Sequence, residues 1–245
     1  MRSADTTLRV FTFSGGFGLP STGPFALKLL TWLRLARIPY HQEIEDDPRR
    51  GPKGKNPWIE IDGQRMGDTE LVIEYLGRRY ERDLDAHLDP GRAALGVALQ
   101  RMVEEHLHQI FEYELIVEDA GFRHIKAGFD VVPRPLRGLV VRAFRGHFKK
   151  QLFARGIGRH APEDRTRMGK RDIDAIANTL GVGEGPWALG ARPSTVDATI
   201  FGFLAPMVFS PLETPVFRYA RQTPAIAAYC RRVQEVAFGP DRETS

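Results

Sequence analysis

The sequence predicts an α/β domain of about 80 residues, followed by a longer domain made only of helices. Two observations carry this prediction. The first part of the chain alternates short β-prone runs with amphipathic helical runs, whereas every periodic segment after a polar, turn-rich stretch has helical spacing. That stretch, ERDLDAHLDPGR at 81–92, is the expected linker. We therefore expect one domain at 1–82 and a second, all-α domain at 92–245.

The α/β part has a definite order of elements. A β-prone run at 8–13 precedes an apolar helical run at 25–36, which Pro24 can start because a first-turn residue needs no N–H. A second strand is expected at 38–45. The segment WIEID (58–62) is expected to form a third strand. Asp62-Gly63 then predicts a two-residue hairpin turn that leads into a fourth strand. The last helix begins at Asp68-Thr69, residues suited to capping.

The second part carries apolar residues at helical spacing throughout. The longest runs lie at 93–118 and at 134–155. Further helices are expected after 161 and at 193–204, 213–221 and 223–237. Ser194 and Asp197 have the spacing of a capping box at the start of a buried helix, which is a structural role.

Composition excludes several classes of protein. The chain is 42% hydrophobic and 27% charged, as in ordinary globular proteins, and its formal net charge of +4 is weak ground for a nucleic-acid partner. Cys230 is the single cysteine, so an internal disulfide and a multi-cysteine metal site are excluded. We expect no signal peptide and no transmembrane segment, and a reducing cytoplasm as the compartment.

The segment GPKGKNPWIEIDGQRMGDTELVIEYL (51–76) carries the most chemistry. Pro57, between a loop and a strand, is where a cis bond would turn the backbone. Asn56 would then offer its N–H and C=O to an extended peptide. Asp68 and Thr69 offer backbone N–H groups and a hydroxyl at a helix start, which suit a ligand carboxylate. The alternative is that these residues only form a rigid turn and a helix cap.

This segment resembles the glutathione-binding half of cytosolic glutathione transferases. The residues in register with the family pattern are Pro52, Gly54, Lys55, Pro57, Asp68, Thr69, Ile73, Tyr75 and Leu76. The resemblance implies a thioredoxin-like first domain and glutathione as co-substrate. It also implies that Asp68 and Thr69 hold the γ-glutamyl end and that Lys55 serves the rest of the peptide. Over most of its length the chain is similar to the failed-axon-connection and metaxin-like branch of this superfamily.

The stretch FSGGFGLPSTGPFALK (13–28) precedes the first helix. It lacks the spacing of a phosphate-binding loop, so nucleotide binding is not expected. The resemblance places the glutathione sulfur here, but Gly23 stands where related thioltransferases carry a catalytic cysteine, which weakens that activity. Ser21 and Thr22 are the candidate hydroxyl donors to the thiolate, with Ser14 as a third. The alternative is that Ser21 or Thr22 merely caps the helix.

Other features suggest weaker sites. Glu104, His108 and Glu112 share one helical face, but no second segment completes a metal site, so no metal is expected. Residues 131–162 contain basic residues and no acidic one, which fits either a solvated helix face or an anionic surface partner. Cys230 is expected to be packed in the core.

The expected function is conjugation of glutathione to a small hydrophobic electrophile, as in detoxification. The electrophile is expected between the 13–28 stretch and the helix around 104–113, where His106 and Tyr113 are the candidate lining residues. A non-enzymatic module for protein or membrane-surface contact is the alternative. A homodimer is expected only from the resemblance.

Overall fold

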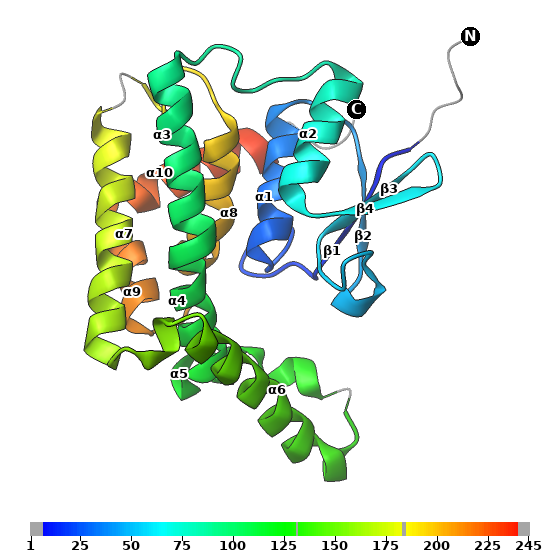
Figure 1. The fold of residues 1–245 in the computed structure, drawn as a ribbon, viewed down its shortest axis with the longest axis vertical. Coiled ribbons are helices and arrows are strands. Elements are labelled where there is room, and N and C mark those ends of the chain that lie inside the picture. The colour runs from blue at the N-terminus through cyan, green and yellow to red at the C-terminus, as the bar shows by residue number, and fades with distance from the viewer. Residues whose placement is uncertain (1–6, 131, 183–184, 240–245) are drawn as a thin grey trace.

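The computed structural model describes residues 7–130, 132–182 and 185–239. Its first domain is built on a four-stranded sheet in the order β2-β1-β3-β4 (Figure 1). The strands are β1 (Arg9–Thr12), β2 (His41–Ile44), β3 (Trp58–Ile61) and β4 (Gln64–Gly67). β2 runs parallel to β1, whereas β3 pairs antiparallel with both β1 and β4. The predicted thioredoxin-like fold is confirmed.

Two helices complete this domain, α1 (Pro24–Leu35) and α2 (Thr69–Tyr80). Every residue of α1 from Ala26 to Leu33 is buried. A helix that packs on a sheet alone buries only the side chains of one face. Because consecutive residues of α1 are buried, both of its faces must be covered. The second cover is the helical domain, whose α8 packs along α1.

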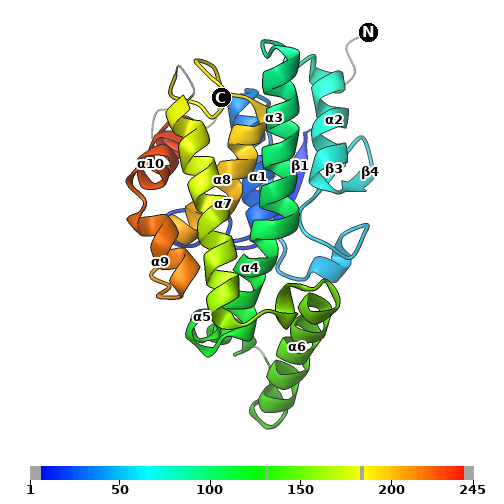
Figure 2. The same ribbon diagram turned by 60° about the vertical axis from the view of Figure 1, so that its left-hand side comes forward.

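The second domain is all-helical, as predicted (Figure 2). Its elements are α3 (Pro90–Arg101), η2 (Met102–Leu107), α4 (His108–Glu112), η3 (Tyr113–Val117), α5 (Asp119–Ile125), η4 (Lys126–Phe129), α6 (Arg134–Ala154), η5 (Ile157–Arg159), α7 (Pro162–Val182), α8 (Thr195–Phe209), α9 (Pro215–Gln222) and α10 (Pro224–Phe238). The continuous helix expected at 93–118 instead contains two π-helical segments, η2 and η3. Each changes the directions of the side chains that follow it.

Helix α8 forms the centre of the second domain and is buried on all sides. Its predicted capping box is confirmed: the Asp197 carboxylate accepts hydrogen bonds from the N–H and the hydroxyl of Ser194 at 2.8 and 2.7 Å. It also accepts bonds from the N–H of Ala188 and the hydroxyl of Tyr229. Asp197 therefore joins the start of α8 to α10 and to the preceding loop.

Helices α1 and α8 meet closely at Gly202. A Cβ atom at this position would lie 2.8 Å from the carbonyl oxygen of Pro24 and 2.8 Å from the amide nitrogen of Lys28. Both are backbone atoms, which cannot rotate away as a side chain can. Gly202 therefore sets the distance at which the first helix rests on the second domain.

We predict that Gly202→Ala lowers the free energy of unfolding by about 1–3 kcal/mol, because the added methyl group forces α1 away from α8. Gly146→Ala is the matched control, since a Cβ there meets nothing within 4 Å. That change should be neutral or stabilising by up to about 1 kcal/mol. Urea denaturation of both variants is the measurement, and equal stabilities would contradict the argument.

Candidate functional site

Sheet register brings three separate loops to one edge of the first domain. Phe11 pairs with Trp58, and Trp58 pairs with Gly67, so β1 ends where β3 begins and β4 ends. The stretch leading to α1, the loop before β3 and the start of α2 therefore lie together. Every predicted glutathione-binding residue of the first domain belongs to one of these loops.

The loop before β3 presents backbone polar groups. The Asn56–Pro57 peptide bond is cis, as predicted. The Asn56 side chain donates from Nδ2 to the carbonyl oxygen of Glu45 at 2.9 Å, which fixes the loop against the end of β2. Among the described residues, the backbone N–H and C=O of Asn56 have no hydrogen-bond partner. They are free to pair with an extended ligand. Lys55 beside them is exposed.

The start of α2 is capped by Asp68. Its Oδ1 accepts bonds from the N–H groups of Glu70 and Leu71 at 3.1 and 3.4 Å, and its Oδ2 lies 3.5 Å from Nζ of Lys53. Asp68 has φ of 84°, a conformation that non-glycine residues adopt at a cost. Capping thus occurs, yet the carboxylate remains half-exposed at the site. Thr69 next to it is buried.

Gly23, which aligns with the cysteine of related thioltransferases, lies at the start of α1 against the ring of Phe13. A Cβ atom on Gly23 would lie 2.7 Å from Cδ2 of Phe13, so a larger residue requires the Phe13 ring to move. Gly23 is the N-cap and provides no side-chain bond to the helix. The first-turn N–H groups of Phe25 and Ala26 therefore remain available, while Pro24 has none.

The candidate hydroxyls differ in their surroundings. Ser21 is fully buried, and its Oγ accepts a bond from the N–H of Gly23 at 3.3 Å, which leaves its own proton uncommitted. Thr22 is exposed, and its hydroxyl donates to the carbonyl oxygen of Ser14 at 3.1 Å. The Ser14 hydroxyl donates to Asp46 at 2.6 Å. Catalysis by Ser21 or Thr22 stays a prediction.

One helical face of the second domain turns toward α1. It carries Glu104, His108 and Glu112, whose spacing in the sequence resembles half a metal site. Glu104 is buried and accepts a 2.5 Å hydrogen bond from Nζ of Lys28, which is also buried. The ring of His108 packs edge-on against Phe25 in the first turn of α1, with 5.1 Å between centroids. This face therefore touches the helix start where the sulfur is expected.

Glu112 continues this face toward the sheet edge. Its side chain is largely buried, and burial raises the pKa of its carboxyl above the usual value. Arg155 lies 3.8 Å away, and Lys55 is near enough that its charge opposes the rise. Glu112 Oε2 is buried without a hydrogen bond in the described structure. A buried carboxyl with one oxygen beside His108 and the other without a hydrogen bond thus lies within electrostatic range of Lys55 in the predicted glutathione loop.

His106 and Tyr113 lie elsewhere. His106 Nδ1 bonds to Asp172 of α7 at 2.6 Å, which raises the pKa of the imidazole. The guanidinium of Arg165, also on α7, stacks 3.8 Å from the centre of the Tyr113 ring. Both predicted lining residues therefore contact α7 rather than α1. The spacing of four residues between Glu104 and His108 showed that they share a helical face. The sequence does not show that this face is the one that contacts α1.

Helix α2 is tied to the second domain beside the site. Arg101 at the end of α3 makes two hydrogen bonds to the Glu70 carboxylate, at 2.7 and 2.8 Å. Glu70 directly follows Thr69. This contact between domains fixes the helix start that is predicted to hold the γ-glutamyl end.

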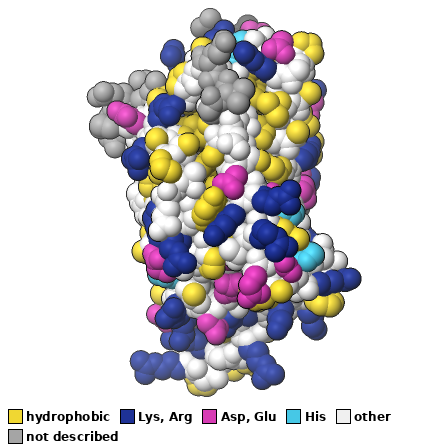
Figure 3. All heavy atoms as spheres, turned by 90° about the vertical axis from the view of Figure 1, so that its left-hand side faces the viewer, with side chains coloured by type: hydrophobic (Ala, Val, Ile, Leu, Met, Phe, Trp, Pro, Cys, Tyr) yellow, Lys and Arg dark blue, Asp and Glu magenta, His cyan; other side chains and the backbone are white. Residues whose placement is uncertain are grey.

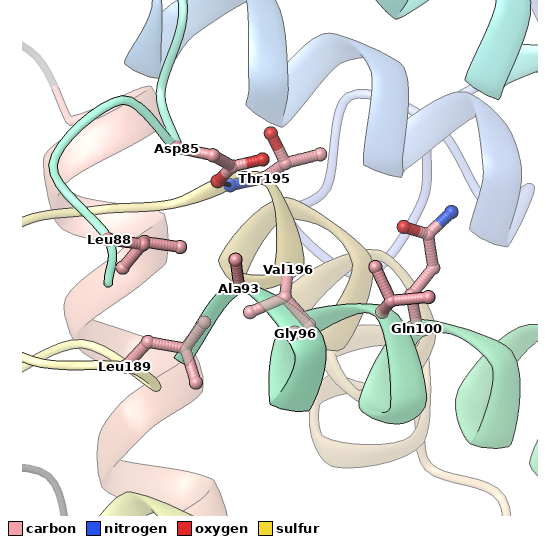
Figure 4. Close-up of a pocket in the computed structure, with 9 residues that line it drawn as sticks. Asp85, Leu88, Ala93, Gly96, Gln100, Leu189, Thr195 and Val196 are labelled. Carbon is pink, nitrogen blue, oxygen red and sulfur yellow. Dashed lines mark hydrogen bonds between the residues drawn. The ribbon is translucent and has the colours of Figure 1, made fainter. Parts of the chain in front are cut away.

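A small hollow lies away from the predicted residues. Figure 4 shows it between the linker, α3 and the start of α8, lined by Asp85, Leu88, Ala93, Gly96, Val97, Gln100, Leu189, Thr195 and Val196. None of the predicted site residues lines it. Within the described ranges, no group of three or more metal-ligating side chains occurs, and no helix has the length and apolar character to cross a bilayer.

Family models match both parts of the chain. The glutathione S-transferase N-terminal domain matches residues 24–121, and the glutathione S-transferase C-terminal domain matches residues 169–233. The two matches together span more than half of the chain.

The chain belongs to the glutathione S-transferase superfamily.

Relatives confirm the expected branch. The isoprene-epoxide–glutathione S-transferase of Rhodococcus sp. (strain AD45) is 27% identical, over 93% of this chain and 98% of the relative. Failed axon connections of Drosophila melanogaster is 27% identical over 95% of this chain, which spans only 58% of that protein. Metaxin-1 of Macaca fascicularis is 23% identical over 94% of this chain and 75% of the relative.

Solved structures confirm the fold of this superfamily member. The glutathione transferase GSTFuA3 from Phanerochaete chrysosporium superimposes with a TM-score of 0.63, over 95% of this chain and 98% of that chain, at 16% identity. At this identity the likeness shows the fold alone.

We predict that Lys28→Met in this transferase-like chain lowers the free energy of unfolding by about 3–5 kcal/mol, because buried Glu104 loses its hydrogen-bonded cation and keeps only Arg101, 3.7 Å from its Oε2. The double variant Lys28→Met/Glu104→Gln should recover part of this loss. Arg78→Met is the control: it breaks an exposed pair with Glu74 and should change stability by less than about 0.5 kcal/mol. Similar losses in Lys28→Met and Arg78→Met would refute the role of the buried pair.

A second prediction concerns pH. Burial lowers the pKa of His108 to about 4 from its ordinary value of 6.5. Between pH 6.5 and pH 4, His108 is therefore protonated in the unfolded chain but neutral in the folded chain. The free energy of unfolding consequently falls as the pH is lowered through this range. The loss due to this group is about 3 kcal/mol. Urea unfolding of the parent and His108→Gln at pH 7 and pH 4 measures it.

The comparison reports on His108 together with Glu112, whose Oε1 lies 3.7 Å from Nε2 of His108, because groups away from this pair titrate alike in both proteins. Burial raises the pKa of Glu114 to about 7, so this group increases the free energy of unfolding as pH falls, in the parent and in the variant alike. The parent should lose more stability than His108→Gln between the two pH values. Equal losses would show that His108 titrates normally in the folded chain.

Proposed function

We propose that the chain binds glutathione and joins it to a small electrophile. The observation that carries this proposal is the assembly of three loops at one sheet edge. There, Asn56 offers unpartnered backbone groups, Asp68 and Thr69 begin α2, and the first turn of α1 offers free N–H groups. An extended tripeptide with an acidic end and a thiol matches these three features.

In the proposed complex the backbone of Asn56 pairs with glutathione as an added strand does. The γ-glutamyl carboxylate lies at the start of α2, where the helix dipole favours negative charge, and the Asp68 carboxylate meets its ammonium. Lys55 pairs with the remaining carboxylate. The sulfur then lies at the start of α1.

The first turn of α1 supports the chemistry. Partial positive charge at a helix start, together with N–H donors, stabilises a thiolate and so lowers the thiol pKa. The thiolate attacks the electrophile: a carbon–sulfur bond forms, and the leaving group departs or a strained ring opens. The name of the Rhodococcus relative makes epoxides the first substrates to test. Detoxification in a reducing cytoplasm is the proposed setting.

Calorimetric titration with glutathione tests binding. We expect millimolar or tighter binding in the parent and roughly 10-fold weaker binding in Thr69→Val, which removes a hydroxyl without changing size. Thr179→Val is the matched control, because its hydroxyl bonds only within α7. No heat and no thermal stabilisation at millimolar glutathione would refute the proposed function.

Conjugation of an aryl halide or an epoxide tests the sulfur site. We predict that Ser21→Ala lowers kcat on the order of 100-fold, because the Ser21 proton is the one not committed within the protein. Thr22→Ala should stay within about 3-fold, since the Thr22 hydroxyl already donates to Ser14. Unchanged kcat in both variants would assign thiolate stabilisation to the helix start alone.

A non-enzymatic glutathione-binding module is the second candidate. The burial of Ser21 and the engaged hydroxyl of Thr22 favour it, because both limit direct contact with a sulfur atom. Binding of glutathione without conjugation of any electrophile tested would decide for this candidate.

A further inference from the structure

Helix α6 projects from the body of the molecule. In Figures 1 and 2 it extends beyond the rest of the second domain at the lower end. One of its faces is covered by aromatic contacts. Phe144 packs against Phe129 of η4 at 5.1 Å and against Phe148 at 4.9 Å, and Phe129 packs against Phe122 of α5 at 5.8 Å. The contact between Phe144 and Phe129 joins this face of α6 to η4, whereas the opposite, outer face has no such contact among the described residues.

That outer face is apolar and exposed. Leu136 is 54% exposed, Leu139 67% and Val140 38%. Ala143 is exposed as well. Their spacing of three, four and seven residues places them on one side of the helix. A group of exposed apolar side chains of this kind indicates a surface that binds a protein or a membrane.

The charged side chains of α6 itself are all basic. Residues 131–162 contain no acidic side chain. Of the six basic side chains of α6, Arg137 pairs with Asp130 and Arg145 with Asp119, both at 2.7 Å. The other four have no ion pair within the described part of the chain: Arg134, Arg142, Lys149 and Lys150. Figure 3 shows Lys and Arg gathered at this end of the molecule.

We propose that α6 docks on the surface of an anionic lipid bilayer. Leu136, Leu139 and Val140 enter the boundary between headgroups and acyl chains, while Arg142, Lys149 and Lys150 contact anionic headgroups. Docking of this kind is peripheral and reversible, since the helix buries few apolar side chains. The docking needs neither glutathione nor a thiol, so it is independent of the proposed function.

The combination of charges and leucines selects this partner. A nucleic acid would contact the basic residues but gain nothing from exposed leucines. A second copy docked through its own α6 would bring two basic helices together, and their charges would repel. An anionic bilayer matches both the charges and the apolar face.

Vesicle sedimentation tests the proposal. The full chain is mixed with vesicles of phosphatidylcholine alone, or of phosphatidylcholine with phosphatidylglycerol. We expect binding to the anionic vesicles only, weakened by salt. The triple variant Arg142→Gln/Lys149→Gln/Lys150→Gln should lower the partition coefficient on the order of 100-fold. Leu136→Ser/Leu139→Ser should lower it about 10-fold at unchanged charge.

Arg171→Gln/Arg192→Gln/Arg218→Gln is the control, because it removes the same charge from exposed positions outside α6. It should bind anionic vesicles within about 3-fold of the parent. The glutamine variants keep every apolar side chain, so they remain informative if the serine pair folds poorly. Equal loss in the two triple variants, absence of vesicle binding, or binding to duplex DNA alone would overturn the proposal.

Discussion

The buried ion pair between Lys28 and Glu104 is the interaction on which the site depends. It joins α1 of the first domain to η2 of the second, and Gly202 sets the spacing of α1 against α8 nearby. A lysine and a glutamate are stable at this depth only as partners. Because α1 is fixed from two sides, its first turn has a defined position relative to Asn56 and to His108.

Much of the fold was predictable from local signals. The hairpin at Asp62-Gly63, the cap at Asp68 and the capping box at Ser194 each depend on residues close in sequence, and each is confirmed. The π-helical segments η2 and η3 could not be predicted. The helical spacing of apolar residues shows which face is buried, but it does not show that one turn contains an extra residue.

For the candidate site, the sequence predicted which residues lie together only in the first domain, and their binding of glutathione stays a prediction. Asn56, Pro57, Asp68 and Thr69 belong to one spaced motif, and sheet register then brings them together. In the second domain, the predicted lining residues His106 and Tyr113 contact α7, whereas the ring of His108 contacts α1. Which face of a buried helix meets a second domain depends on tertiary packing, which no local pattern records.

Gly23 leaves the proposed thiolate site without a side chain at the helix N-cap. Phe13 occupies the space of a side chain at this position, and no described side chain replaces the missing cysteine directly. We therefore assign thiolate stabilisation in the proposed complex to the first turn of α1 together with the Ser21 hydroxyl. Ultraviolet absorbance of bound glutathione across a pH series measures this directly. We predict a thiol pKa of about 7.5 or lower in the complex, whereas a value unchanged from free glutathione would contradict the account.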